Sequence, residues 1–297
     1  MISIGTLNAS RPLQGDESLK EHGGVIAQGA GRIREFQERV YRFYRKNGRD
    51  LPWRRTTVPY EILVSEIMLQ QTQVERVCGR YERFLVRFPD FPALAGAELR
   101  DVLHEWQGLG YNRRAKSLHA TAGIVMGQYE GVLPDNEKVL ASLPGIGKAT
   151  AASIVAFAFN RPSVVIETNI RRVFIHCFFD DQETVSDRDI APLVAATCDR
   201  ENPRAWYYAL MDLGSSLKTR IPNPNRRSTM YRRQARFEGS DRMIRGRILA
   251  FLVGEDRISV PDLVSRLESD PGRVESILKT LEKEGFMKNE KGFLTLR

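Results

Sequence analysis

The chain has 297 residues, 42% of them hydrophobic and 28% charged, with a formal net charge of +8 at pH 7. This length allows several buried cores, so more than one domain is expected. No apolar stretch approaches the ~20 residues of a membrane span, and the N-terminus lacks a charged-then-apolar signal pattern. We therefore expect no membrane partner and a cytoplasmic protein, associated with the nucleoid if the source is prokaryotic. Cys78, Cys177 and Cys198 lie far apart without metal spacing, so neither a disulfide framework nor a cysteine-bound metal is expected.

The predicted elements are mostly α-helical. Residues 1–32 are Gly-rich and polar without periodicity, which predicts a mobile tail. From Ile33 to Gly254, apolar residues recur at spacings of three and four in runs separated by Gly, Pro and Asn, which predicts a helical body.

The C-terminal residues 241–297 have a different pattern. Three short helical runs precede "FMKNEKGFLTL", which predicts a hairpin that turns through Asn289 to Gly292. Three helices and a hairpin resemble a winged helix. Such a domain could contact DNA or only pack against the core, and the sequence leaves both open.

The positive charge is concentrated in one segment. Between Lys218 and Arg247 there are ten basic and two acidic residues, a difference equal to the net charge of the whole chain. A solvated charged face is one interpretation, and a polyanionic partner such as nucleic acid is the other.

The segment "LPGIGKATAASI", Leu143 to Ile154, places two glycines directly before an apolar helix. Glycine permits positive φ and close approach of backbone to a ligand, and a helix start favours an anion such as phosphate. A nucleotide P-loop would need a glycine where Ser142 stands and a preceding strand, so it is excluded. An ordinary Gly-rich turn remains the alternative.

From about Arg34 to Leu217 the chain resembles the helix-hairpin-helix-GPD DNA glycosylases, most closely the adenine DNA glycosylases (MutY). Five motifs match in order and spacing. They are "LPW" (51–53), "SEIMLQQTQV" (65–74), "GLGYNRRAKSLH" (108–119), the hairpin at 143–154 and "MDLGS" (211–215).

The resemblance implies a two-lobed glycosylase core. Residues 51–162 would form a six-helix lobe with the helix-hairpin-helix, and 33–50 plus 163–217 the second helical lobe. A basic segment, 218–240, and a winged-helix-like domain, 241–297, would follow. DNA would lie in the cleft between the lobes, with Glu66 and Glu167 on its opposite sides.

Glu66 aligns with the general acid of the adenine glycosylases. Ile62, Leu63 and Leu69 share its helix face, so apolar surroundings should raise its pKa and keep it protonated. A salt bridge to an arginine is the structural alternative.

Glu167 aligns with the aspartate that stabilises the sugar cation, and Asn169 with a supporting asparagine. Both residues also suit a helix start, so capping is an alternative for each. Glutamate is one methylene longer than the family's aspartate, by roughly 1.5 Å. This departure puts the activity, or the substrate, of the chain in question.

Several residues are expected at DNA. The hairpin would bind backbone phosphate, while Gln71 and Tyr111 resemble residues that probe and wedge into the base stack. Core packing for Tyr111 and a solvated face for Gln71 are the alternatives. The predicted contacts are Gln71, Tyr111, Arg113, Arg114, Gly145, Gly147, Lys148 and Thr150.

Two further departures define the chemistry. Ala149 stands where bifunctional relatives carry a Schiff-base lysine, so no lyase activity is expected; Lys148 should point roughly 100° away around the helix. Most relatives begin a four-cysteine iron–sulfur loop after "MDLGSSL", but no cysteine follows Lys218. We therefore expect no cluster and interpret Arg226, Arg227, Arg232 and Arg233 as a phosphate-binding replacement.

The sequence thus predicts a monomeric, monofunctional DNA N-glycosylase of base-excision repair. It would act on double-stranded DNA with a mismatched or damaged base, adenine being the preferred candidate. Alternatives are a thymine, uracil or modified-base glycosylase and a non-catalytic mismatch or lesion binder. No cofactor is expected, although the hairpin backbone leaves room for a monovalent cation.

Overall fold

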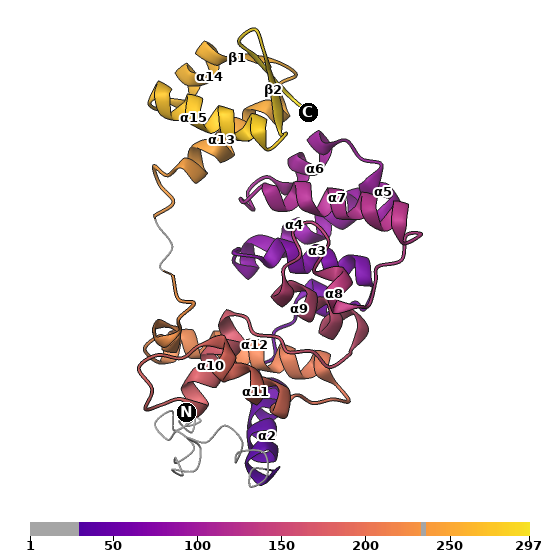
Figure 1. The fold of residues 1–297 in the computed structure, drawn as a ribbon, viewed down its shortest axis with the longest axis vertical. Coiled ribbons are helices and arrows are strands. Elements are labelled where there is room, and N and C mark those ends of the chain that lie inside the picture. Colours follow the sequence, from indigo (N-terminus) through magenta and orange to yellow (C-terminus); the bar gives the residue numbers. More distant parts are fainter. Residues whose placement is uncertain (1–29, 233–235) are drawn as a thin grey trace, which may run out of the picture. The chain divides into compact units, whose positions relative to one another are not determined.

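The computed structural model describes residues 30–232 and 236–297. A mobile tail is expected over residues 1–32. Residues 1–29 lie outside the described residues, and residues 30–32 belong to helix α2, which begins at Ala30. The chain forms two compact units, whose described parts are residues 30–50 with 151–232 and residues 51–150 with 236–297. The division falls at 150/151 instead of the expected 162, and the C-terminal residues belong with 51–150. The fold is mostly α-helical, as predicted (Figure 1).

The unit of residues 30–50 and 151–232 is built around α10 and α12, which pack against each other. Its elements are α2 (Ala30–Asn47), most of α9 (Lys148–Phe159), α10 (Thr168–Phe178), α11 (Asp187–Thr197), α12 (Pro203–Arg220) and the 3-10 turn η3 (Pro224–Arg227). Phe36 of α2 makes edge contacts with Phe174 of α10 and Trp206 of α12, at 5.7 and 5.8 Å between ring centroids. These buried rings join three helices far apart in the sequence.

Residues 51–150 form a cluster of short helices. Its elements are η2 (Pro52–Arg54), α3 (Pro59–Leu69), α4 (Val74–Arg87), α5 (Phe91–Ala95), α6 (Leu99–Trp106), α7 (Arg113–Gln128) and α8 (Glu137–Leu140). Helix α3 packs against α4, α7 and η2. Seven of its residues are buried, so α3 is the central helix of this cluster: Tyr60, Ile62, Leu63, Val64, Ser65, Ile67 and Met68.

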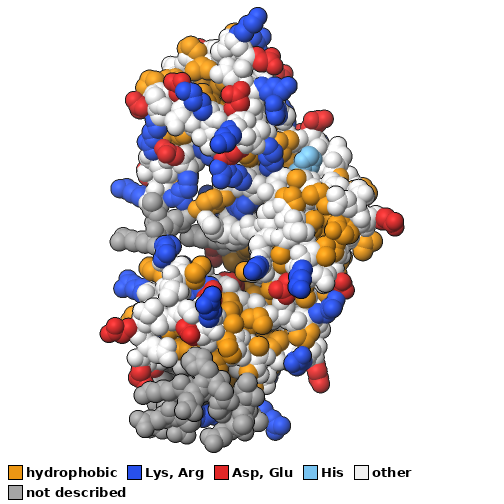
Figure 2. Space-filling view, viewed as in Figure 1, with side chains coloured by type: hydrophobic (Ala, Val, Ile, Leu, Met, Phe, Trp, Pro, Cys, Tyr) orange, Lys and Arg blue, Asp and Glu red, His pale blue; other side chains and the backbone are white. Residues whose placement is uncertain are grey.

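The C-terminal residues form three helices and a small sheet. The elements are α13 (Asp241–Gly254), β1 (Ile258–Ser259), α14 (Val260–Leu267), α15 (Pro271–Lys283), β2 (Met287–Glu290) and β3 (Phe293–Leu296). The strands are antiparallel in the order β1-β3-β2. The hairpin turns at Lys291 and Gly292, both with positive φ. Figure 2 shows Lys and Arg side chains interspersed with Asp and Glu over this part of the surface.

Among the described residues, no helix has the length and apolar character needed to cross a membrane.

Candidate functional site

Glu66 lies near the C-terminal end of α3. Its side chain is half-buried, whereas its neighbours Ser65 and Ile67 are buried. Ile62 and Leu63, one turn earlier, are 1% and 0% exposed. Two of the apolar residues expected on the Glu66 helix face are therefore buried, and the role of Glu66 as a general acid stays a prediction.

Glu167 is the residue at which α10 begins. Its backbone is extended, with φ −118° and ψ 177°, and its Oε1 accepts hydrogen bonds from the backbone N–H groups of Asn169, at 2.8 Å, and Ile170, at 3.1 Å. The side-chain amide of Asn169 also donates to Oε2, at 3.5 Å. The capping interpretation of Glu167 is therefore correct. It is compatible with chemistry, because Oε2 is held less closely than Oε1.

The pKa of the Glu167 carboxyl is raised above its ordinary value. Loss of hydration on burial is the largest cause, and it outweighs the lowering effects of the Ile170 and Asn169 backbone N–H groups and of the Arg171 and Arg172 charges. Carboxyl groups with a raised pKa, which are costly to ionise, are common at functional sites.

Arg172 is a site residue that the sequence analysis missed. Its side chain is buried, and Nη1 donates to Asn169 Oδ1 at 2.8 Å and to the Gly214 carbonyl at 2.6 Å. It thereby joins the first turn of α10 to α12. The available signal was its position three residues after Asn169, on the same helix face.

The hairpin between α8 and α9 depends on Gly145. This glycine has φ +76°, and a Cβ there would lie 2.6 Å from Ser117 Cβ, so any other residue would be strained and would force Ser117 to shift. The Gly145 carbonyl and the Thr150 hydroxyl both accept from Gln70 Nε2, at 3.1 Å each. Gln70, which the sequence analysis passed over, therefore ties the end of α3 to the hairpin.

The two residues expected to probe the base stack share an uncommon conformation. Gln71 and Tyr111 have φ values of +53° and +49°, in the left-handed region that side chains with a Cβ rarely adopt. Such strain persists only where surrounding contacts impose it, and it clusters at functional sites. Both side chains are exposed or nearly so, Tyr111 at 36%.

Arg114, expected at a DNA phosphate, is a buried clamp between these two turns. Its guanidinium donates to five acceptors: the carbonyls of Ile67, Met68, Leu109 and Gly110 and the hydroxyl of Thr72. Burial lowers its pKa to about 10, so it remains a cation at neutral pH. The side chain thus holds the end of α3 against the Tyr111 turn and is engaged within the fold.

We expect Arg114→Met to lower the free energy of unfolding by about 3 kcal/mol, because buried acceptors would lose their donor. Urea unfolding measures this change. The matched control is Arg113→Met, whose side chain is 69% exposed and paired with Glu284, with an expected loss under about 1 kcal/mol. Equal losses for the two variants would show that Arg114 is no clamp.

Arg113 faces the C-terminal domain. Glu284 accepts hydrogen bonds from Arg113 and Arg245, and these two partners hold its pKa below the usual range despite the opposing effect of burial. Close by, Arg242 of α13 donates to the Tyr111 hydroxyl at 2.8 Å. The C-terminal domain therefore adjoins the turn expected to enter the base stack.

Of the basic segment expected to bind phosphates, Arg227 is engaged inside the fold. Its guanidinium donates to the carbonyls of Ile175, Phe179, Asp180 and Gln182, at and beyond the end of α10. Arg232 donates to the carbonyls of Thr229 and Tyr231, Arg226 is exposed, and Arg233 lies outside the described residues.

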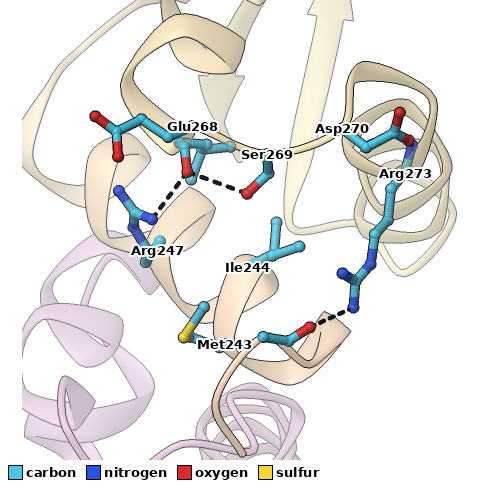
Figure 3. Close-up of a pocket in the computed structure, with 9 residues that line it drawn as sticks. Met243, Ile244, Arg247, Glu268, Ser269, Asp270 and Arg273 are labelled. Carbon is cyan, nitrogen blue, oxygen red and sulfur yellow. Dashed lines mark hydrogen bonds between the residues drawn. The ribbon is translucent and has the colours of Figure 1, made fainter.

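A cavity of about 350 Å³ lies in the C-terminal domain, away from these residues. Arg247 donates to the Leu267 carbonyl at 2.9 Å, and Arg273 donates to the Gly239 carbonyl at 2.7 Å (Figure 3). Both guanidinium groups therefore brace the domain around this cavity.

The residues present do not fit a four-cysteine iron–sulfur cluster. The chain has three cysteines, and Cys177 and Cys198 are buried thiols without a disulfide. Within the described ranges, no group of three or more His, Cys, Asp or Glu side chains is arranged to hold a metal ion.

Comparison with known proteins agrees with this fold. Residues 64–191 match the family described as HhH-GPD superfamily base excision DNA repair protein. The chain is similar to an adenine DNA glycosylase of Mycobacterium tuberculosis, with 37% identity over 230 residues, covering 71% of this chain and 76% of that one. It is also 34% identical over 260 residues to an adenine DNA glycosylase of Mycolicibacterium smegmatis, covering 80% and 88%.

Among solved structures, the chain resembles a thermostable thymine-DNA glycosylase, with TM-score 0.56, 26% identity and coverage of 62% and 87%. An endonuclease III in a non-covalent DNA complex shares the fold, with TM-score 0.55 and 19% identity. The extent of the match to the mycobacterial relatives shows the family. The chain belongs to the HhH-GPD superfamily of base excision DNA repair proteins, among the adenine DNA glycosylases.

Proposed function

We propose that this base excision DNA glycosylase releases a mispaired adenine from duplex DNA by hydrolysis. The observation that carries the proposal is the Glu167 carboxylate, fixed at the start of α10 soon after the hairpin. Two backbone N–H groups hold one of its oxygens, and its pKa is raised. The names of the mycobacterial relatives support adenine as the base.

In the proposed reaction the nucleotide is flipped out of the duplex before its N-glycosidic bond breaks. Glu66 donates a proton to the departing base, which keeps the bonding electron pair. The sugar is left as an oxocarbenium-like cation, and the Glu167 carboxylate stabilises its charge. Water adds to the sugar carbon and loses a proton to Glu167, which yields free base and an abasic site.

The strand itself should stay intact. Ala149 offers no amine for a Schiff base, so elimination of the phosphate by that route has no nucleophile at this position. We therefore propose a monofunctional enzyme.

The longer side chain of Glu167 reaches back to the first turn of its own helix. A glutamate at a helix start can fold its chain back so that its oxygen reaches the N–H groups of the first turn, as it does here at Asn169 and Ile170. We propose that this places the carboxylate close to where the family's shorter aspartate would carry it. Asn169 then orients the second oxygen.

The proposed DNA surface combines several described features. The strained turns of Gln71 and Tyr111 would enter the base stack, and the hairpin would bind backbone phosphate. The C-terminal domain, winged-helix-like in its order of elements, adjoins Tyr111 through Arg242. The proposed phosphate contacts are Gly145, Gly147, Lys148, Thr150, Arg113, Arg226, Arg232 and Arg233, whereas Arg114 and Arg227 serve the fold.

The remaining parts of the proposal are a monomer that acts on mismatched or damaged duplex DNA in the cytoplasm or nucleoid. It would work without an iron–sulfur cluster, and the hairpin backbone is where a monovalent cation could bind.

The test is base release from a panel of duplexes that carry A, T, U, hypoxanthine or an oxidised purine in each mispair, followed by hot alkali. We expect strand breaks from mispaired adenine, and only after alkali. Release of thymine or uracil alone would move the chain to another substrate. Binding without release from any duplex would identify a non-catalytic mismatch binder, and breaks without alkali would contradict the monofunctional assignment.

The raised pKa of Glu167 predicts a pH dependence. The ionised form is needed for catalysis, so base release should fall at acid pH, beginning above the usual carboxyl range. Because the folded-state pKa exceeds the unfolded one, protonation of Glu167 favours the folded state. Activity should therefore fall while this residue's contribution to stability rises as pH decreases.

Single-turnover rates test the expected fall in activity, and thermal unfolding tests the expected rise in stability. Each is measured between about pH 4 and 8, a range that includes the ordinary glutamate pKa. Glu167→Gln is the control, because it removes the titrating group and with it this pH dependence of stability. If the rate of base release fell only at or below the ordinary pKa range of carboxyl groups, the role given to Glu167 would be contradicted.

A further inference from the structure

The segment that stands in place of the cluster loop runs along α10. It consists of residues Asn223 to Ser228 and includes η3, which packs directly on α10. Asn223 caps η3, and its Oδ1 accepts from the Asn225 backbone N–H at 3.2 Å. Ser228 pairs with Val185, just before α11. The segment is thus fixed in shape and attached at several points within one compact unit.

Asn225 contacts the start of α10 beside the catalytic candidate. Its side chain is 4% exposed, and its Nδ2 donates to the Thr168 carbonyl at 2.9 Å. That carbonyl belongs to the peptide unit whose N–H is Asn169 N, the same group that donates to Glu167 Oε1. Because a peptide unit is planar, fixing its carbonyl oxygen also fixes the direction of its N–H.

Two further contacts join the segment to the same helix. Arg172 Nε donates to Asn223 Oδ1 at 3.5 Å, and Arg172 Nη1 donates to the side-chain oxygen of Asn169. Arg227 donates to carbonyls at the other end of α10, including those of Ile175 and Phe179. The segment therefore contacts α10 at both ends, and it holds the start of this helix beside Glu167.

Stability alone does not account for Asn225. Its Oδ1 is buried and has no hydrogen-bond partner in the part of the chain that the structure describes. A buried acceptor without a donor reduces stability, and an apolar side chain of similar size would avoid that cost. An amide is useful here for its donor, which points at Thr168.

We propose that residues Asn223–Ser228, at the place in the chain where most relatives carry an iron–sulfur loop, form a strut that holds the start of α10, with Asn225 as a positioning residue for Glu167. The proposal rests on the catalytic role given to Glu167. The three cysteines of the chain cannot form the four-cysteine loop of the relatives, so this strut is made of side-chain amides and arginines. Asn225 acts through the backbone at Thr168 and touches neither DNA nor the reacting atoms.

The test uses Asn225→Leu, which keeps the branching and the number of side-chain heavy atoms and removes the donor, and Asn225→Ala. Both should slow single-turnover base release by about 10- to 100-fold, since a shift near 1 Å has effects of that size. Duplex affinity should change by less than about twofold, because no DNA contact is removed. The acid limb of the rate should move to higher pH, because the N–H bonds that lower the Glu167 pKa would loosen.

A second readout does not need activity. Hydrogen exchange of the Asn169 and Ile170 amides should accelerate in both variants, while Asn225→Leu should unfold at the same temperature as the unmodified protein or higher. The matched control is Asn202→Ala, an exposed asparagine at the start of α12 whose side chain makes no capping bond. It should change neither the exchange at α10 nor the rate.

The outcomes separate the two proposals. Unmodified protein that releases no base would refute the glycosylase function, and the exchange data would still decide whether Asn225 holds the first turn of α10. Normal rate, pH profile and exchange in Asn225→Leu would overturn the strut. Stoichiometric iron and sulfide in the purified protein would also overturn it, because a cluster would then be present.

Discussion

Replacing Glu66 by glutamine should slow base release by about 10²- to 10⁴-fold, the range for losing a general acid. Glutamine keeps nearly the same shape, so the half-buried position in α3 and the packing of Ile62 and Leu63 should be preserved. What is lost is a proton that can move to the leaving base. Single-turnover rates on an adenine-mismatched duplex measure the effect, and equilibrium binding to the same duplex should be nearly unchanged.

Glu61→Gln is the matched control, since Glu61 lies in the first turn of the same helix. It should release base at close to the rate of the unmodified protein. If Glu66→Gln were equally active, the proton would have to come from another group, and the assignment of Glu66 would fail. A loss of duplex binding in Glu66→Gln would instead indicate a structural role.

Gly214→Ala should lower the free energy of unfolding by more than about 3 kcal/mol, beyond the usual range for overpacking. A Cβ on Gly214 would lie 2.1 Å from the carbonyl oxygen of Asn169 and 2.6 Å from its carbonyl carbon. These are backbone atoms, so no side-chain rotation relieves the clash. The start of α10 would have to move away from α12, and the Arg172 bridge to Gly214 would break.

Urea unfolding measures the loss, and base release should fall with it because Glu167 lies at the displaced helix start. Gly123→Ala, in α7, is the control: nothing lies within 4 Å of its added Cβ, and its backbone is helical. Alanine there should stabilise by roughly 0.5–1 kcal/mol, because glycine is unfavourable inside a helix. Comparable behaviour of the two variants would mean that the α10–α12 approach tolerates a methyl group.

The hairpin glycine and the position of Glu167 at a helix start were predictable because their signals are local. Gly145 stands out in sequence as one of two glycines before an apolar helix, and the fold uses it at positive φ against Ser117. Glu167 stands at the boundary between an apolar run and a helix, which is where it caps α10. The capping and catalytic interpretations of Glu167 were never exclusive, since the N–H groups that it caps also orient its carboxylate.

The arginines were less predictable, because their partners come from distant parts of the chain. Arg113 and Arg114 are neighbours in the sequence with the same charge. Arg113 is exposed and pairs with Glu284, whereas Arg114 is buried and donates to five acceptors. Arg227 belongs to a run that suggested phosphate binding, but its donors meet the free carbonyls at the end of α10. A charge run gives the sign of a surface and does not identify which members face solvent.

The helical fold class and the family could be predicted from the sequence, because helix periodicity, glycine punctuation and motif spacing are properties of short segments. The clamps formed by Arg114 and Arg227, the Arg172 bridge from α10 to α12 and the contact of Asn225 with the Thr168 carbonyl became visible only in the folded chain. A buried donor must find an acceptor, and here the acceptors come from parts of the chain that are distant in sequence. Free carbonyl groups at helix ends belong to the backbone, so no residue type identifies them in advance.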